Sequence, residues 1–419
     1  MKKLIIIALA IRLILLFSTS YHPDLGNHLD WGNRFWQYGP SNFYHQSIWS
    51  VSWPNQPLGT IYLFAFIAKI NQTLFSFFWY LNTHIPLFPS NLIPLLEKNL
   101  HIWLVKLPFI GSDLGSGILV YYLLKKKYKR AAAAAAFFLL NPALIYNSAV
   151  WGQTDSLINF LALASLYFLD QKKPSLALFL LLISFLFKFS LTIFLPAFLI
   201  YYLKSKPKLS SIILTLTIFL SFSFLLALPF SQSTNPLIWL FNISRDRVLA
   251  GQGGMLNGNA FNLWAIIYGI DLSLKESITL LGLSASQIGK LIFAVFSLPV
   301  IIKIYFLPKF KNLIYSYFLI SYTAFLFLTN MHERYLYPVF IPFIILLFFH
   351  PKIFKTKDYL LLSLIHLLNL FNLWFYPSLP FLKKLLEYKS FSLPRLFALI
   401  LICFWLNFYI KYLKHENKS

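Results

Sequence analysis

Long apolar runs, separated by short polar or basic segments, recur along the whole 419-residue chain. A helix needs about 20 apolar residues to cross the hydrocarbon core of a bilayer. We expect crossing helices over residues 4–20, 101–124, 131–149, 156–170, 209–230, 288–307, 312–329, 339–350, 359–376 and 393–412. Two shorter runs, 175–187 and 190–203, predict a hairpin with Lys188 at its tip. The pattern therefore predicts an all-α polytopic membrane protein with about 12 transmembrane helices.

The composition excludes an ordinary soluble globular protein. Hydrophobic residues make up 58% of the chain, charged residues make up 12%, and the mean hydropathy is +0.67. A net charge of +23 would suggest a nucleic-acid partner for a soluble protein, but Lys and Arg cluster here between the apolar runs. That placement is the orientation signal of a plasma or inner membrane, so we expect a bilayer and no nucleic acid as partner. Because apolar runs continue to the C-terminal end, the first run is expected to be an anchor and not a cleaved signal peptide.

Basic segments set the expected orientation. Lys2 and Lys3 place the N-terminus in the cytoplasm, and the basic run 125–130 should be cytoplasmic as well. One clear crossing helix, 101–124, precedes that run. If the apolar stretch 57–80 also crossed once, the basic run would be moved to the other side. We therefore expect 57–80 to form interfacial helices or a shallow hairpin within the first outer loop.

Two acidic residues, Asp24 and Asp30, follow closely on the first apolar run. Acids are scarce in this chain, with 13 Asp and Glu against 36 Lys and Arg. An acid in a loop beside a rigid scaffold is often functional. The alternative is a structural role, in which Asp24 caps a helix that begins at Leu25 and Asp30 pairs with Arg34 one turn later.

The expected topology brings four polar segments to the same outer face. They are Asp24 with Asp30, the Trp-Gly-Gln-Thr-Asp run that holds Gln153 and Asp155, Arg245 with Arg247, and the triplet His332, Glu333 and Arg334. A carboxylate there can take the proton of a bound hydroxyl as a general base. Arg and His at the mouth of a helix bundle can hold a phosphate by charge-assisted hydrogen bonds. The combination predicts a lipid phosphate as ligand, with its headgroup at this face and its chain in the bilayer.

Several of these residues have structural alternatives. Asp155 could be an N-cap, and Lys188 could either snorkel to the headgroups or reach a donor phosphate. Asp113 lies inside an apolar run, where a carboxylate is functional by default, although a structural pairing or an N-cap at a broken helix would also explain it. The triplet 332–334 could be a solvated boundary turn. The glycine-rich run 251–258 lacks the Lys of a P-loop, and we expect a mobile lid there.

Four motifs resemble those of the GT-C membrane glycosyltransferases. Asp24, followed by Trp-Pro-Asn-Gln-Pro at 53–57, resembles their first outer loop, although relatives often have adjacent prolines there. Residues 141–155, from Asn-Pro to Trp-Gly-Gln-Thr-Asp, resemble their second outer loop. Residues 241–264 resemble the segment before their later spans. Asn-Met-His-Glu-Arg-Tyr-Leu-Tyr-Pro at 330–338 is similar to the His-Glu-Arg/Lys motif of polyprenyl-phosphate-sugar-dependent mannosyl- and glucosyltransferases.

The resemblance implies a GT-C-type helix bundle, related to the enzymes that extend N-glycan and GPI precursors and to their prokaryotic relatives. Residues 1–340 would form the catalytic transmembrane module, and residues 341–419 would add C-terminal transmembrane helices. Such an enzyme passes one sugar, here expected to be mannose, from a polyprenyl-phosphate donor to an acceptor hydroxyl. The transfer proceeds with inversion on the non-cytoplasmic side of the cell membrane.

The same resemblance implies roles for single residues. Asp24 would be the catalytic base, and Asp30 could share or replace its role. His332 and Arg334 would contact the lipid phosphate, while Gln153 and Asp155 would line the sugar or acceptor pocket. The predicted substrate-binding set comprises Gln153, Asp155, Lys188, Arg245, Arg247, His332, Glu333 and Arg334.

No cofactor is expected for such a reaction. The sequence has no tight metal-ligand spacing, and its single Cys403 lies in an apolar run, so we expect metal independence while a divalent metal stays open. The expected partners are a polyprenyl-phosphate-linked sugar donor, a glycan, lipid or protein acceptor, and the bilayer itself.

A transporter or flippase of a lipid-linked glycan or anionic solute is the alternative from a different class. A ligase that moves a whole glycan is a third hypothesis. A transporter should carry its ionisable groups near the middle of the bilayer, on interrupted helices. Because this chain concentrates them in the expected outer loops, we favour the enzyme.

Overall fold

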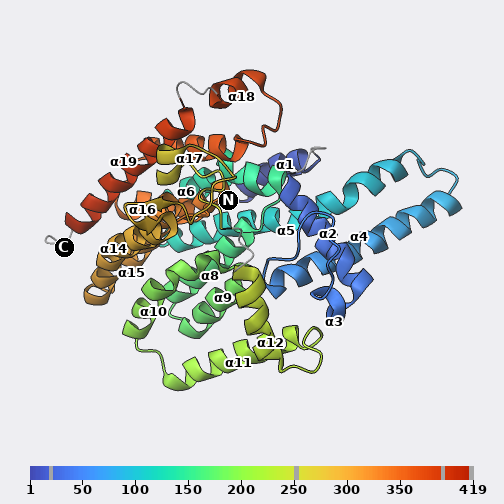
Figure 1. Cartoon of the computed structure of the whole chain (residues 1–419), viewed down its shortest axis with the longest axis horizontal. Coiled ribbons are helices and arrows are strands. Elements are labelled where there is room, and N and C mark those ends of the chain that lie inside the picture. Colours follow the sequence, from blue (N-terminus) through green and yellow to red (C-terminus); the bar gives the residue numbers. More distant parts are fainter. Residues whose placement is uncertain (18–21, 250–253, 388–391, 415–419) are drawn as a thin grey trace.

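The computed structural model describes residues 1–17, 22–249, 254–387 and 392–414. These residues form a nearly all-α protein that includes one short hairpin, β1 (Thr279–Leu280) with β2 (Leu283–Ser284) (Figure 1). Within this part of the chain, five helices are long and apolar enough to cross a membrane, or six if a bent pair counts as one span. The prediction of a helical, membrane-embedded protein is thereby confirmed.

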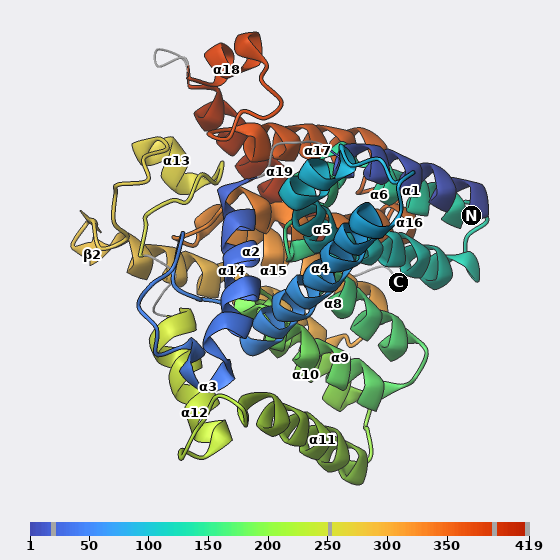
Figure 2. The ribbon, with the colours of Figure 1, turned by 90° about the vertical axis from the view of Figure 1, so that its right-hand side faces the viewer.

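The first half of the chain contains the helices up to α10. They are α1 (Lys2–Leu16), α2 (Pro23–Tyr38), α3 (Pro40–Phe43), α4 (Leu58–His84), α5 (Leu92–Lys125), α6 (Ala131–Leu139), α7 (Pro142–Ile145), η1 (Tyr146–Trp151), α8 (Asp155–Asp170), α9 (Pro174–Phe187), η2 (Phe189–Phe194) and α10 (Leu195–Lys204). Here η marks a short 3-10 or π helix. In Figure 2, which looks at the right-hand side of Figure 1, α2 lies in front of the helix bundle.

The second half completes the bundle. Its helices are α11 (Leu209–Ala227), α12 (Pro236–Ile243), η3 (Ser244–Leu249), α13 (Leu263–Tyr268), α14 (Ala285–Phe306), α15 (Phe310–Phe327), η5 (Glu333–Val339), α16 (Phe340–Phe349), α17 (Thr356–Phe371), α18 (Pro380–Glu387) and α19 (Leu393–Lys414). Helix α15 is the centre of the core, because 16 of its 18 residues are buried. It packs against α14, α16, α19, α10 and η5.

The apolar stretch 57–80 forms one continuous helix, α4, and not a set of interfacial helices or a shallow hairpin within the stretch itself. From Thr60 to His84 the sequence contains no proline or glycine, so nothing interrupts the backbone hydrogen bonds. Helix α4 turns back into the 34-residue α5, which starts nine residues before the predicted run at 101. The two helices project together from the helical body (Figure 1).

The predicted run 131–149 is broken where its sequence contains Asn-Pro. Pro142 has no backbone N–H to donate, and the Asn141 side chain accepts hydrogen bonds from the N–H groups of Ala143 and Leu144. The chain bends by 48° between α6 and the following α7–η1 segment. The predicted hairpin is likewise interrupted at Lys188, whose backbone is extended between α9 and η2. These breaks position Asp155 and Lys188 at the same end of the bundle.

Asp113 is part of a buried polar network between helices. Its carboxylate accepts hydrogen bonds from Arg12 at 3.0 Å, Ser148 at 2.6 Å and Tyr337 at 2.5 Å. The residues belong to α5, α1, η1 and η5, and all four are buried. A buried charge is tolerated when it is paired and its remaining lone pairs are satisfied. The structural-pairing alternative for Asp113 is therefore confirmed, and the N-cap alternative is wrong because α5 runs through this position without a break.

Candidate functional site

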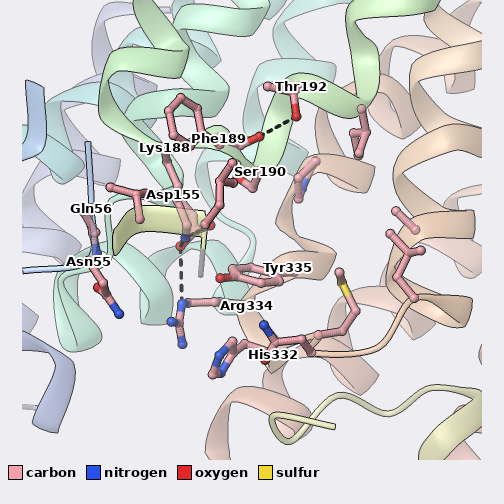
Figure 3. Close-up of a pocket in the computed structure, with 18 of the residues that line it drawn as sticks. Asn55, Gln56, Asp155, Lys188, Phe189, Ser190, Thr192, His332, Arg334 and Tyr335 are labelled. Carbon is pink, nitrogen blue, oxygen red and sulfur yellow. Dashed lines mark hydrogen bonds and ion pairs between the residues drawn. The ribbon is translucent and has the colours of Figure 1, made fainter. Parts of the chain in front are cut away.

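A cavity of about 490 Å³ opens among α2, the loop before α4, the start of α8, η2, the end of α15 and η5. Its polar lining includes Asp24, Asn27, His28, Asn55, Gln56, Asp155, Lys188, His332 and Arg334. Its apolar lining includes Phe189, Ile193, Val248, Leu249, Ala324, Phe325 and Leu328. In Figure 3 the labelled Asn55 and Gln56 lie on one side of the charged residues, and the ribbon of α15 lies on the other. The cavity therefore combines charged and amide side chains with an apolar surface from η2 and α15.

Helix α2 presents one face to this cavity. Asp24, Asn27, His28 and Trp31 follow helical spacing and all line it. Pro23 is the first helical residue, and His22 is the N-cap, whose ring nitrogen Nδ1 accepts a hydrogen bond from the backbone N–H of Asp24. Asp24 lies inside the first turn, so the expectation that its side chain caps the helix is wrong. The side chain of Asp24 is 31% exposed and faces the cavity.

Two donors hold the carboxylate of Asp24. Arg334 Nη1 and Gln153 Nε2 each lie 3.1 Å from its Oδ2 atom. Burial alone would raise the pKa of Asp24, but the positive charge of Arg334 lowers it below its ordinary value. Gln153 is buried behind Asp24 and does not border the cavity. It therefore positions the carboxylate, whereas the sequence predicted that it lines the sugar or acceptor pocket.

Opposite charges alternate along one wall of the cavity. Lys188 Nζ lies 2.9 and 3.2 Å from the two carboxylate oxygens of Asp155. Arg334 Nε lies 3.9 Å from Asp155 Oδ2 (Figure 3). Arg334 Nη1 lies 3.1 Å from Asp24 Oδ2 and continues the series. Thr154 occupies the N-cap position of α8, and Asp155 follows it without making a capping bond, so the N-cap alternative for Asp155 is wrong. The Lys188 side chain is 11% exposed, which excludes snorkelling to the headgroups.

The triplet 332–334 alternates its side chains between the cavity and the protein interior. His332 is extended, η5 begins at Glu333, and His332, Arg334 and Tyr335 line the cavity. Glu333 does not line it, but lies 3.2 Å from Arg334 and is buried. Burial raises the pKa of Glu333 to about 7 in spite of the charge of Arg334. The alternative of a solvated boundary turn is therefore wrong.

The backbone at Gly258 passes close to the His332 side chain. The Gly258 N–H donates to the Met331 carbonyl at 2.9 Å. A side-chain carbon at position 258 would lie 2.9 Å from two atoms of the His332 ring. Because Gly258 has no side chain, this second segment of the chain can pack directly against the His332 ring. The predicted lid at 251–258 falls partly on residues 250–253, which lie outside the described residues.

Besides Gln153 and Glu333, three more predicted site residues do not line the cavity. Asp30 accepts hydrogen bonds from Arg34 Nε at 2.7 Å, from the Ser50 N–H at 2.9 Å and from the Ser50 hydroxyl at 2.8 Å. The Arg34 pairing expected as its structural role is confirmed, and Asp30 fastens the loop after α3 to α2. Arg245 is largely exposed and pairs with Asp246. The guanidinium of Arg247 lies 4.7 Å from the centre of the Trp53 ring.

His28 and Gln56 line the cavity but were missed from the sequence. The signal for His28 was its position four residues after Asp24, which places both on one helix face. Among the described residues, no group of three His, Cys, Asp or Glu side chains has an arrangement that could hold a metal ion. The arrangement can nevertheless bind an anion at Lys188 and Arg334 and accept a proton at Asp24. No protein-family model and no curated protein matches the chain.

Proposed function

We propose that the protein is an inverting glycosyltransferase with a GT-C-type bundle of about 12 transmembrane helices. It would transfer one sugar, mannose in the first instance, from a polyprenyl-phosphate donor to an acceptor hydroxyl. The observation that carries this proposal is the position of Asp24, a carboxylate paired with Arg334 in a cavity that Lys188 and an apolar surface also line.

The cavity supports a lipid-phosphate donor. Lys188 and Arg334 offer donors to a phosphate, and charge-assisted hydrogen bonds of this kind are the strong ones. The apolar lining from η2 and α15 begins beside them and suits the first isoprene units of a polyprenyl chain. The phosphate would stay at the charged wall, and the chain would continue toward the lipid-facing surface of the bundle.

The chemistry is a single displacement. Asp24 accepts the proton of the acceptor hydroxyl while that oxygen forms a bond to the anomeric carbon of the sugar. The bond from this carbon to the phosphate oxygen breaks, and the lipid phosphate leaves with the electron pair. Arg334 and Lys188 stabilise the negative charge that develops on the leaving phosphate. Because attack and departure occur on opposite faces of one carbon, the configuration inverts.

The arrangement of charges supports a site on the non-cytoplasmic side of the cell membrane. In Figure 1 the C-terminal end of α19, the turn between α14 and α15 and the connection from α10 to α11 lie on the left, while α2 and α3 lie on the right. The left-hand connections contain the basic segments 204–208 and 309–311. Lys and Arg favour cytoplasmic connections, so the end that contains α2 would face outward.

The test is a transfer assay with the purified protein in nanodiscs. Polyprenyl-phosphate-mannose and polyprenyl-phosphate-glucose are each supplied with a panel of glycan, glycolipid and peptide acceptors, and product is followed by mass spectrometry. We expect one donor to yield a product that carries a single added hexose with inverted anomeric configuration. Movement of intact donor across a sealed membrane, without transfer, would replace this proposal by the flippase alternative.

A further inference from the structure

Two uncharged residues that line the cavity each have a buried polar atom without a partner among the described residues. His28 Nδ1 and Gln56 Oε1 have no hydrogen-bond partner among the described residues, and both side chains line the cavity. Buried polar atoms are nearly always hydrogen-bonded, so an unsatisfied one next to a cavity points to a missing ligand group. His28 comes from α2 and Gln56 from the loop before α4, so two separate segments contribute.

The His28 ring is held in a fixed position. It stacks on Phe64 of α4, with ring centres 4.2 Å apart. Helices α2 and α4 approach closely here, since a side-chain carbon at Gly32 would lie 2.5 Å from the Phe64 carbonyl oxygen. Side chains held by such packing are suited to selecting a ligand by hydrogen-bond direction.

His28 is uncharged in this environment. Burial lowers its pKa to about 3, and the nearby charge of Asp24 does not offset that effect. A neutral imidazole has one N–H donor and one acceptor nitrogen, and the Gln56 amide also combines both functions. Hydroxyl groups match such donor–acceptor pairs, whereas a phosphate would favour the cations Lys188 and Arg334 on the charged wall.

We propose that His28 and Gln56 form a subsite for the hydroxyl groups of the transferred sugar. The subsite rests on the proposed function, and it divides the donor between two kinds of contact. Lys188 and Arg334 hold the phosphate, and His28 and Gln56 bind the hydroxyl groups of the sugar ring. His28 lies one helical turn from Asp24, so a sugar held there has its anomeric carbon within reach of both the base and the phosphate site.

The experiment compares a donor with and without its sugar. Binding of polyprenyl phosphate and of the polyprenyl-phosphate-sugar that the wild type transfers is measured in nanodiscs for the wild type, His28→Phe and Gln56→Leu. Phenylalanine keeps the stack on Phe64 and removes the hydrogen bonds. We expect each variant to bind the sugar-bearing lipid about 2- to 12-fold more weakly, which is the effect of one neutral hydrogen bond. Binding of the sugar-free lipid should be unchanged.

The matched control is His366→Phe. His366 is also buried, also lacks a hydrogen-bond partner for either ring nitrogen among the described residues, and stacks on Phe340. It does not line the cavity, so its replacement should leave both affinities unchanged. The subsite is refuted if His28→Phe and Gln56→Leu weaken both lipids equally, or weaken neither. A wild type that transfers no sugar from either donor would refute the proposed function itself.

Discussion

Two Arg–Asp pairs of similar geometry have different surroundings in this protein. Arg12 Nη2 lies 3.0 Å from Asp113, and Arg334 Nη1 lies 3.1 Å from Asp24. The first pair is fully buried, and Ser148 and Tyr337 also donate to Asp113. Asp24 has Gln153 as its further donor and is 31% exposed. A buried pair whose carboxylate accepts from several helices fixes those helices, whereas a pair that borders a cavity can exchange its partner for a ligand.

Replacement of Asp24 tests the functional member of this comparison and should have the largest effect. Asp24→Asn removes the proton acceptor and retains the shape, so turnover should fall by about 10²- to 10⁴-fold. Donor binding should be at least as tight as in the wild type, because Arg334 loses a competing carboxylate. Both are measured with the polyprenyl-phosphate-sugar that the wild type uses.

Asp30→Asn is the matched control, since it removes a second carboxylate from the same helix but outside the cavity. Its effect on turnover should be small. If Asp30→Asn abolishes turnover and Asp24→Asn does not, Asp30 is the base and the mechanism assigned to Asp24 is wrong.

Asp113→Asn tests the structural role of the buried Arg12–Asp113 pair. Removing one partner of a buried ion pair leaves the other charge uncompensated, which typically costs about 3–5 kcal/mol. We expect a large fall in resistance to thermal and denaturant unfolding in detergent, with Asp24→Asn much less affected. The exposed pair supplies a control, because Asp246→Asn removes a solvent-screened surface contact and should leave stability nearly unchanged. Equal stability of Asp113→Asn and wild type would contradict the structural role.

Glu333, a third acid beside Arg334, gives the surroundings of the cavity pair a pH dependence. Burial raises the pKa of Glu333 from 4.5 to about 7. The folded protein therefore holds this proton more tightly than the unfolded chain does. The resulting stability is present below pH 4.5 and is lost as the pH rises toward 7, by about 3 kcal/mol at most.

The measurement is unfolding midpoint against pH for the wild type and Glu333→Gln, which stays neutral. The difference between the two proteins should change across this pH range, with the wild type losing stability relative to the variant. Parallel curves would show that Glu333 titrates alike in the folded and unfolded states.

Replacement of Arg334 tests the cavity pair through the binding of the donor. Arg334→Ala should weaken donor binding by roughly ten- to over a hundredfold, corresponding to about 1.5–3 kcal/mol for a charged hydrogen bond. Arg334→Lys should lose less, because it retains a point charge without the planar fork. Acceptor binding should barely change. Arg245→Ala is the control and should leave donor affinity unchanged, since Arg245 is exposed outside the cavity. Unchanged donor affinity in Arg334→Ala would contradict the proposed contact between Arg334 and the phosphate.

Local patterns were sufficient to predict the helical membrane protein and much of the site. The motifs at 151–155 and 332–334 indicated Asp155, His332 and Arg334, and all three line the cavity. The pattern also indicated that Lys188 interrupts an apolar hairpin. These predictions needed only the residue types and the breaks between apolar runs, which are properties of short stretches of chain.

Contacts between distant segments determined the features that the local sequence pattern could not predict. Whether Asp24 or Asp30 faced the cavity depended on Ser50, which bonds to Asp30 from another segment. Gln153 was expected to line the cavity, but its distance from Asp24 in the chain concealed the hydrogen bond that places it behind the carboxylate. The continuity of α4 was missed because the distribution of basic residues reports topology and not helix length.

The contact between Asp24 and Arg334 also bears on the order in which substrates bind. A sugar carbon cannot fit between a carboxylate and a guanidinium that are 3.1 Å apart. On the proposed mechanism, the incoming donor must first draw the guanidinium onto its phosphate, and this movement releases the carboxylate for the acceptor. Catalysis would then follow a compulsory sequence, donor first and acceptor second. An acceptor that arrives early would meet a base still engaged with Arg334, and would leave unchanged.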